Sequence, residues 1–227
     1  MEGLGYRCFR GTVLPVPARV ASPLRTTLSA THAHAVASLL PLLGCGEEAA
    51  SLAFDDIADR YAKPLERSAL QGIALEERAH DDIIQMLIAM MPEQPDMPDM
   101  LKAARRFHIK LGRGAPAERL ARIAALDSAV CLILSRLTRA RNPIASDPQI
   151  AAPLIGIRND EARHVSVSRA LAMASLPRAT LYELGTCTRR AFADVLMLGG
   201  DAMEALGIDP CALERDIRIL PPGMFRS

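Results

Sequence analysis

Two copies of the pattern Glu-x-x-His, far apart in the chain, contain the residues whose spacing is most informative about chemistry. The first copy is Glu77 and His80, and the second is Glu161 and His164. Residues three apart on a helix share a face, so each pair can direct a carboxylate and an imidazole into one interior space. Carboxylates combined with two imidazoles suit iron or manganese better than calcium or structural zinc. Two copies together therefore favour a metal site, although one copy alone is common by chance.

Two further carboxylates, Glu47 and Asp127, precede these pairs at similar distances. Glu47 lies 30 residues before Glu77, and Asp127 lies 34 residues before Glu161. Two successive helical hairpins would therefore return each Glu-x-x-His pair to the level of one preceding carboxylate, and the near-equal separations indicate an internal repeat. Glu48 is a weaker candidate than Glu47, because the helical stripe through Glu48 is less apolar.

Four helices are predicted to position these six residues. In each helix, apolar residues recur at alternating steps of three and four, as expected when one face is buried. The apolar stripes run from Leu40 to Tyr61, from Leu70 to Met91, from Leu120 to Leu137 and from Leu154 to Leu171. The candidate ligands interrupt these stripes. Burying so many ionisable groups without a partner would cost several kcal/mol per charge, so a multivalent cation is expected among them.

Prolines and glycines predict where the helices end and how they are joined. The second helix should begin after Pro64 and stop at Pro92. Residues 92 to 115 then form a long connection with a possible short helix around Leu101 to Leu111. A fifth helix is expected from about Thr180 to Leu206, weakened at its Gly-Gly pair, with a role in packing or dimerisation.

Composition limits the classes of protein that the chain can represent. Its 227 residues are half apolar, which predicts a folded protein with a substantial core. A net charge of +1 gives no reason to expect nucleic acid as a partner. Five cysteines without C-x-x-C spacing predict reduced thiols and a cytoplasmic location rather than a disulfide framework or zinc ribbon. The apolar stretch from Ala35 to Cys45 is too short to span a membrane, and no membrane partner is expected.

The chain is predicted to comprise an N-terminal arm and one helical domain. Residues 1 to 27 contain Arg residues and three prolines, which predict an extended arm rather than an amphipathic targeting helix. Residues 28 to 227 are predicted to form a single domain. His32, His34 and His108 lie off the four apolar stripes, and we expect them at the surface or at an interface.

The six candidate ligands, in their order along the chain, resemble those of the ferritin-like di-iron carboxylate superfamily over roughly residues 40 to 175. The resemblance implies an all-α, ferritin-like four-helix bundle with a long crossover connection, here with an added C-terminal helix and an extended N-terminal arm. It implies two iron ions, or a mixed manganese and iron centre. The roles that it implies are bridging for Glu77 and Glu161, terminal nitrogen for His80 and His164, and terminal carboxylate for Glu47 and Asp127.

The same resemblance implies a second layer of residues around the ligands. Glu76 and Asp160, which immediately precede the two motifs, would each accept a hydrogen bond from the histidine of the opposite hairpin. Asp127 departs from the Glu that is common in this family, which could open the coordination sphere of one metal ion. No catalytic residue beyond the metal ligands is expected.

Sites of this kind support several reactions, so the resemblance implies a set of activities rather than one. The leading hypothesis is a non-haem di-iron oxidase or oxygenase that activates dioxygen and oxidises a small, apolar organic substrate. An external electron donor and a homodimer are compatible with it. The alternative is a ferroxidase or iron-binding ferritin-like protein. The residues expected to line or back the substrate cavity are Phe54, Ile73, Ile84, Val130 and Leu134.

Overall fold

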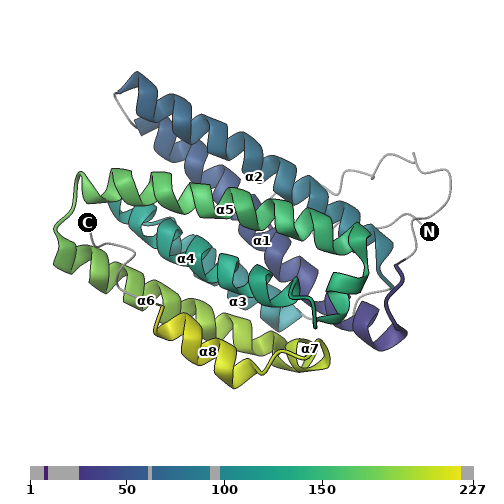
Figure 1. Cartoon of the computed structure of the whole chain (residues 1–227). Helices are drawn as coiled ribbons and strands as arrows, with labels where there is room; N and C mark the ends of the chain where they lie inside the picture. The colour runs from purple at the N-terminus through teal and green to yellow at the C-terminus, as the bar shows by residue number, and fades with distance from the viewer. Residues whose placement is uncertain (1–7, 10–25, 61–62, 93–97, 221–227) are drawn as a thin grey trace.

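The computed structural model describes residues 8–9, 26–60, 63–92 and 98–220, and in this part of the chain the regular secondary structure is entirely helical (Figure 1). The α-helices are α1 (Ala30–Arg60), α2 (Pro64–Met90), α3 (Pro98–Leu111), α4 (Pro116–Leu137), α5 (Pro148–Met173), α6 (Arg178–Leu196), α7 (Gly200–Ala205) and α8 (Pro210–Arg218). Short 3-10 helices span Pro143–Ser146 and Met197–Gly199. The predicted all-α class is confirmed. The arm predicted for residues 1 to 27 lies almost wholly outside the described residues.

The long helices form two antiparallel pairs, which the other helices support. Short connections join α1 to α2 and α4 to α5, so each pair packs along its length (Figure 1). Helix α6 packs against α4, and α8 packs against α6 on the outer side. Helix α3 contacts both α1 and α6. The two hairpins thus bring the mid-portions of α1, α2, α4 and α5 around one interior.

Prolines and side-chain caps explain where several helices begin. Proline stands in the first turn of α2, α4, α5 and α8, where its missing N–H removes no hydrogen bond. Asp147 caps α5, because its Oδ1 accepts a hydrogen bond from the backbone N–H of Gln149 at 3.0 Å. The predicted fifth helix is interrupted, as expected, at its glycine pair: α6 ends at Leu196, and α7 begins at Gly200.

Helix α1 is apolar enough to resemble a membrane-spanning helix, but it is buried in the core of this protein. By length and composition alone it is the one described helix that could cross a membrane, but most of the qualifying window is buried inside the molecule. Pro41 lies within α1 without ending it. Phe54 and Ile57 are wholly buried and pack with the apolar faces of the other long helices. The burial of α1 is therefore accounted for by the interior of this chain.

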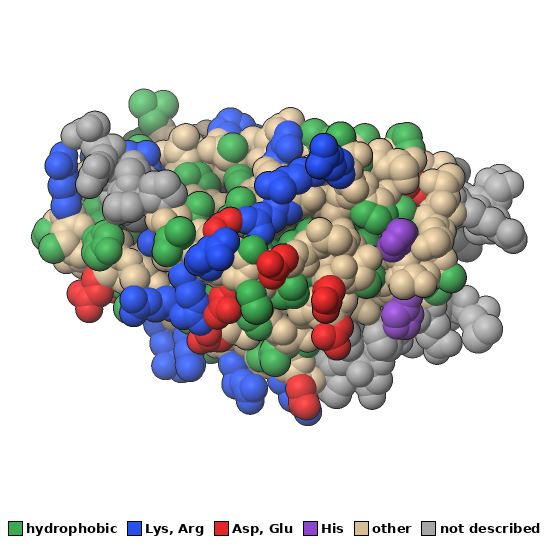
Figure 2. Space-filling view, turned by 60° about the horizontal axis from the view of Figure 1, so that its bottom comes forward, with side chains coloured by type: hydrophobic (Ala, Val, Ile, Leu, Met, Phe, Trp, Pro, Cys, Tyr) green, Lys and Arg blue, Asp and Glu red, His purple; other side chains and the backbone are tan. Residues whose placement is uncertain are grey.

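The face made by α6 and α8 carries charges of both signs. Figure 2 shows Lys and Arg side chains in a band across this face, with acidic side chains beside them. Some of these charges attach α8 to its neighbours: Arg218 Nη2 lies 2.7 Å from Asp194 Oδ1 of α6, and Arg136 of α4 pairs with Asp216. The Arg218–Asp194 pair is partly exposed, and such pairs contribute little stability individually, so the apolar contacts of α8 must supply much of its attachment.

Candidate metal centre

Four buried side chains from three helices converge in the interior. They are Glu47 of α1, Glu77 and His80 of α2, and Glu161 of α5. Each offers one possible ligand atom, and these atoms all lie within 4.8 Å of one another. Both Glu-x-x-His motifs lie in regular helix, so their members share a face as the spacing predicts. The group is compact enough to hold a metal ion.

The second histidine, His164, adjoins this group through the same carboxylates. Its Nδ1 lies 2.9 Å from Glu77 Oε1 and 3.8 Å from Glu161 Oε2. On the other side, His80 Nδ1 lies 3.6 Å from Glu77 Oε2 and 3.5 Å from Glu161 Oε1. Each of these two carboxylates therefore presents one oxygen to each imidazole. Separations of this size are close to the roughly 3 Å between adjacent ligands of an ion bound at about 2 Å.

Glu47 and Asp127 flank this arrangement. Glu47 Oε2 lies 3.3 Å from His80 Nδ1, which places Glu47 on the His80 side. Asp127 of α4 is buried and lines the same cavity as Glu47, Glu77 and Glu161, but it lies outside the compact group of four. The structure therefore brings all six sequence candidates to one region, with Asp127 at its edge.

The ligand-type atoms that face inward make no hydrogen bond of regular geometry in the described part of the chain, although both imidazole Nδ1 atoms lie within ion-pair distance of carboxylate oxygens. They are both carboxylate oxygens of Glu77, Nδ1 of His80, Nδ1 of His164 and Oδ2 of Asp127. Buried polar atoms are nearly always satisfied, and leaving them unpaired costs free energy. A cation placed among these atoms would satisfy the oxygen and nitrogen lone pairs together.

The outer nitrogens of both imidazoles, in contrast, are held by carboxylates from the opposite hairpin. His80 Nε2 lies 3.3 Å from Asp160 Oδ2, and His164 Nε2 lies 2.8 Å from Glu76 Oε2. This is the crosswise pairing that the sequence resemblance implies. Arg163 lies 3.0 Å from both Glu76 and Asp160, a contact that the sequence reasoning missed. Arg163 directly precedes His164, so it lies toward the outer side of α5. This position in the sequence could have indicated a contact with the outer carboxylates.

The outer carboxylates determine which nitrogen carries the proton when each imidazole is neutral, as a metal ligand must be. Burial raises the pKa values of Asp160 and Glu76, but hydrogen bonds from the histidines and Arg163 outweigh burial and lower both. Both carboxylates are therefore ionised at neutral pH and can only accept. Each Nε2–H must then donate outward, which leaves the Nδ1 lone pair directed into the cluster in the neutral imidazole.

The inner groups form a strongly coupled set in the absence of a cation. Burial is the largest influence on Glu47 and raises its pKa to about 8, with the charge of Glu77 adding to the effect. Burial and the negative charges of Glu161, Glu77 and Glu47 raise the pKa of Asp127 well above its ordinary value. Burial lowers the pKa of His80, but the surrounding carboxylates outweigh burial and raise it. The cluster thus takes up protons where a metal ion would compensate the same negative charge.

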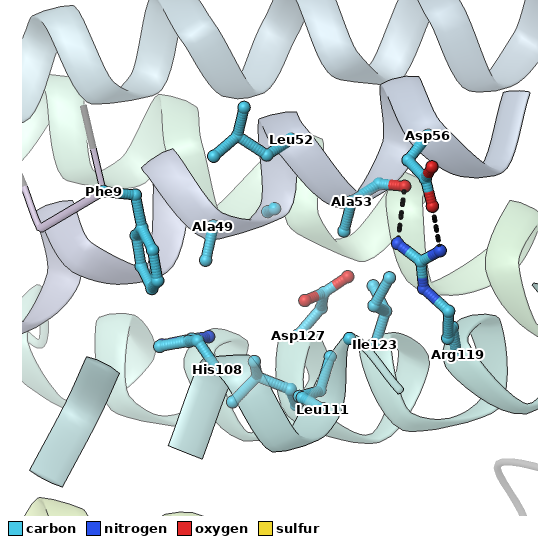
Figure 3. Close-up of a pocket in the computed structure, with 14 residues that line it drawn as sticks. Phe9, Ala49, Leu52, Ala53, Asp56, His108, Leu111, Arg119, Ile123 and Asp127 are labelled. Carbon is cyan, nitrogen blue, oxygen red and sulfur yellow. Dashed lines mark hydrogen bonds and ion pairs between the residues drawn. The ribbon is translucent and has the colours of Figure 1, made fainter. Parts of the chain in front are cut away.

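Two adjoining cavities lead from the cluster toward the surface. The inner cavity, of about 40 Å³, is bounded by three carboxylates of the cluster and by apolar residues that include Val130 and Phe192. The outer cavity, of about 220 Å³, lies between α1, α3 and α4 (Figure 3). The residues common to both linings are Gly46, Ala50, His108, Leu126 and Asp127.

Among the residues expected around a substrate cavity, Val130 lines the inner one. Phe54 is buried against the His164 ring, with 6.2 Å between centroids. Ile73, Ile84 and Leu134 are buried in the apolar core.

The expectation for His108 was wrong. We expected it at the surface or at an interface, but it is 8% exposed and lines both cavities. Its helix, α3, falls in the predicted long connection, and no local pattern in the sequence indicated that this connection packs over the carboxylate and imidazole cluster. Arg119, at the outer cavity, was also missed; its guanidinium pairs with Asp56, and its Nη2 donates to the carbonyl of Ala53 at 3.3 Å (Figure 3).

No protein-family model matches the chain, and no curated protein is significantly similar to it in sequence. The interpretation of the site therefore rests on its geometry and chemistry: a buried group of carboxylates and imidazoles, in an all-helical protein, that is compatible with a di-iron centre.

Proposed function

We propose that this protein is a ferritin-like, non-haem di-iron oxygenase or oxidase. The observation that carries the proposal is the orientation of the two buried imidazoles. Both Nδ1 atoms face the oxygens of Glu77 at 2.9 Å and 3.6 Å without a hydrogen bond of regular geometry among the described residues, whereas both Nε2 atoms are held from outside. A cation between these inward atoms would bind all of their lone pairs, which their contacts with one another do not satisfy.

The chain offers ligands for two ions rather than one. Glu77 and Glu161, each with one oxygen toward each imidazole, are suited to be shared between two ions. Glu47 lies beside His80, and we assign these two residues to one ion. We assign His164 and Asp127 to the other. Four carboxylates and two imidazoles are a donor set that suits iron, with manganese possible in one position.

When bound, two ferrous ions supply electrons for the reduction of dioxygen. For hydroxylation, the balance is R–H + O₂ + 2 e⁻ + 2 H⁺ giving R–OH + H₂O, so two of the four electrons come from the substrate and two from an external donor. The protein contributes by excluding water: apolar side chains wall the inner cavity, and the cluster residues are each at most 5% exposed.

The outer cavity favours an organic substrate over iron as the molecule that enters. An iron-entry path needs acidic side chains that are free to attract a cation. Here Asp56 is paired with Arg119, and most of the remaining lining is apolar. The Arg119–Asp56 pair carries no net charge, so it does not attract ferrous iron into this cavity. We therefore rank the ferroxidase or iron-binding function second. A homodimer in the cytoplasm is part of the proposal.

Anaerobic loading with ferrous iron, followed by exposure to dioxygen, tests the proposal. Two irons per chain, with a change in absorbance and uptake of dioxygen, are the expected results. Failure to bind iron would contradict a di-iron function. Repeated oxidation of added ferrous iron, with ferric iron accumulating beyond two per chain, would instead support the ferroxidase alternative.

A further inference from the structure

His108 is a buried polar group of the cavities that the metal cluster does not use. It is 8% exposed, and in the described part of the chain neither ring nitrogen has a hydrogen-bond partner. Its ring packs edge-on against Phe107, with 5.0 Å between centroids. Figure 3 shows the His108 and Asp127 side chains projecting into the outer cavity. A mostly buried polar ring that faces a cavity and has no hydrogen-bond partner among the described residues is suited to bind a ligand that enters the cavity.

The position of His108 places it next to the metal cluster without making it a ligand. A Cβ added at Gly46 would lie 3.9 Å from His108 Cε1 and 4.0 Å from Nε2, so the ring lies against α1 one residue before Glu47. His108 also lines both cavities, so a group bound to it sits where they meet.

The protonation state of His108 defines what it can recognise. Burial lowers its pKa to about 4, so the ring is neutral at neutral pH. A neutral imidazole has one N–H donor and one acceptor nitrogen. It can bind a hydroxyl or a carbonyl group, but it offers no positive charge to a carboxylate or phosphate. Among the described residues that line the outer cavity, the one Lys or Arg is Arg119, and it is already paired with Asp56.

The sizes of the two cavities orient the bound molecule. The inner cavity of about 40 Å³ admits only a small part of an organic molecule, whereas the outer cavity of about 220 Å³ can hold its body. Apolar residues such as Leu126 and Ile123 line the outer cavity. A molecule whose apolar body occupies the outer cavity and whose polar group binds His108 would have the carbon next to that polar group at the entrance to the inner cavity.

We propose that His108 is a positioning residue that binds the single hydroxyl or carbonyl group of a small, otherwise apolar and uncharged substrate. This inference rests on the proposed function only for the oxidation that follows, because binding in the cavity requires no reaction. It narrows the substrate class to neutral molecules of about the size of a substituted benzene, with the reacting carbon near the polar group.

Binding of two probes of equal size tests this inference: benzyl alcohol, which has a hydroxyl group, and ethylbenzene, which has none. Calorimetric titrations would use the full-length protein, with and without ferrous iron under anaerobic conditions. The variants are His108→Phe, which removes hydrogen bonding, and His108→Gln, which retains a donor and an acceptor. His34→Phe, at an exposed position, is the matched control.

The quantity to compare is the ratio of the two dissociation constants, ethylbenzene over benzyl alcohol. We expect His108→Phe to lower this ratio about three- to tenfold, the usual net effect of one hydrogen bond. The ratio should stay close to the wild-type value in His108→Gln and should be unchanged in His34→Phe. An unchanged ratio in folded His108→Phe would overturn the inference, as would a ratio that depends on iron but not on His108.

A measurement on the unaltered protein covers the case in which His108→Phe does not fold. With ¹⁵N-labelled histidine, benzyl alcohol should shift one imidazole resonance that ethylbenzene leaves in place, and His108→Gln should remove that resonance. No such shift would contradict the inference. If the probes discriminate through His108 but the protein binds no iron, the proposed function fails and the binding site stands. If the protein binds iron and takes up dioxygen but the probes do not discriminate through His108, the proposed function stands and this inference fails.

Discussion

Each histidine of the cluster uses its two ring nitrogens differently, and this difference defines the site at the scale of single residues. The outer Nε2 donates to a carboxylate that is held by Arg163, whereas the inner Nδ1 lies among the carboxylates of the cluster without a hydrogen bond of regular geometry in the described part of the chain. Removing an inner ligand and removing an outer carboxylate should therefore have different consequences for metal binding.

Replacing His80 by Ala should abolish binding of at least one metal ion without unfolding the protein. The ring supplies an inner nitrogen, while the rest of the buried face of α2 is largely apolar and remains in place. Metal analysis after anaerobic iron loading, together with circular dichroism, measures both effects. His34→Ala, at an exposed position, should change neither. Retention of two metal ions in His80→Ala would contradict the ligand assignment.

Replacing Asp160 by Asn should weaken metal binding without abolishing it. The amide can still accept from His80 Nε2, but it lacks the charge that orients the ring and increases the basicity of Nδ1. We expect a loss of about 10- to 100-fold in affinity for the ion bound to His80, the usual effect of altering such a partner. A competition titration with a chelator measures it. Asp59→Asn, exposed on α1, is the control and should have no effect.

At this scale the sequence predicted candidates well but not their full surroundings. Helical phase favoured Glu47 over Glu48, and the structure agrees: Glu47 faces His80, whereas Glu48 Oε2 accepts from the Phe9 backbone N–H at 2.9 Å. Both residues are buried, so burial alone could not have separated them. His108 was missed because its role depends on how α3 packs, which no local spacing encodes.

At the scale of elements, the start of α5 depends on Asp147. This side chain caps α5, and its Oδ2 also accepts from Thr26 Oγ1 at 2.8 Å and from the Thr27 backbone N–H at 2.7 Å. It thereby joins the residues before α1 to the helix that carries Glu161. Burial raises the pKa of Asp147, but these hydrogen bonds outweigh burial and lower it below its ordinary value of 3.8.

Replacing Asp147 by Ala should destabilise the protein by about 1–2 kcal/mol at neutral pH, the usual effect of losing such a cap. Because the pKa is lower in the folded state, the charged form contributes its full stability above 3.8, and this contribution is lost as pH falls through the folded-state pKa. The difference between wild type and variant should therefore narrow in acid. Urea denaturation across pH measures it. Asp147→Asn, which retains an acceptor oxygen, should lose less.

A difference between wild type and Asp147→Ala that stays constant in acid would show that the charge of Asp147 contributes nothing. The start of α5 itself was predictable, since proline in the first turn of a helix is a local signal. The hydrogen bonds from Thr26 and Thr27 were not, because they join residues about 120 positions apart. The packing of α3 against α1 and α6 was unpredictable for the same reason: it depends on contacts between distant segments.

At the scale of the whole molecule, the side chains suited to bind metal lower the free energy of unfolding of the metal-free protein. The surrounding core is largely apolar, whereas the cluster itself consists of four carboxylates and two imidazoles, namely Glu47, Glu77, Asp127, Glu161, His80 and His164. Without a cation, the raised pKa values of Glu47, Asp127 and Glu161 show that the folded interior disfavours their charged forms. The apolar contacts of two helical hairpins must offset this cost in the metal-free protein. A bound cation would remove much of it, so the same residue can lower stability in one state and raise it in the other.

Glu161→Gln should separate these two states. Burial is the main cause of the raised pKa of Glu161, so loss of its charge should leave the metal-free protein at least as stable as wild type. Ferrous iron should then stabilise wild type by about 2.7 kcal/mol at a hundred times its dissociation constant, and the variant by much less. For a protein of this size, each kcal/mol shifts the melting temperature by about 2–4 °C. Anaerobic thermal unfolding with and without iron measures the difference.

The expected order of melting temperatures in this experiment therefore reverses on adding iron: the variant is equal or higher without metal, and wild type is higher with it. Glu183→Gln, exposed on α6, should follow wild type in both conditions. A variant that melts lower than wild type without metal would mean that Glu161 stabilises the fold through its contact with His80, 3.5 Å away, rather than through an ion. Equal stabilisation of both proteins by iron would place the bound ion elsewhere. Only this reversal requires the Glu161 carboxylate both to destabilise the metal-free protein and to bind iron in the metal-bound protein.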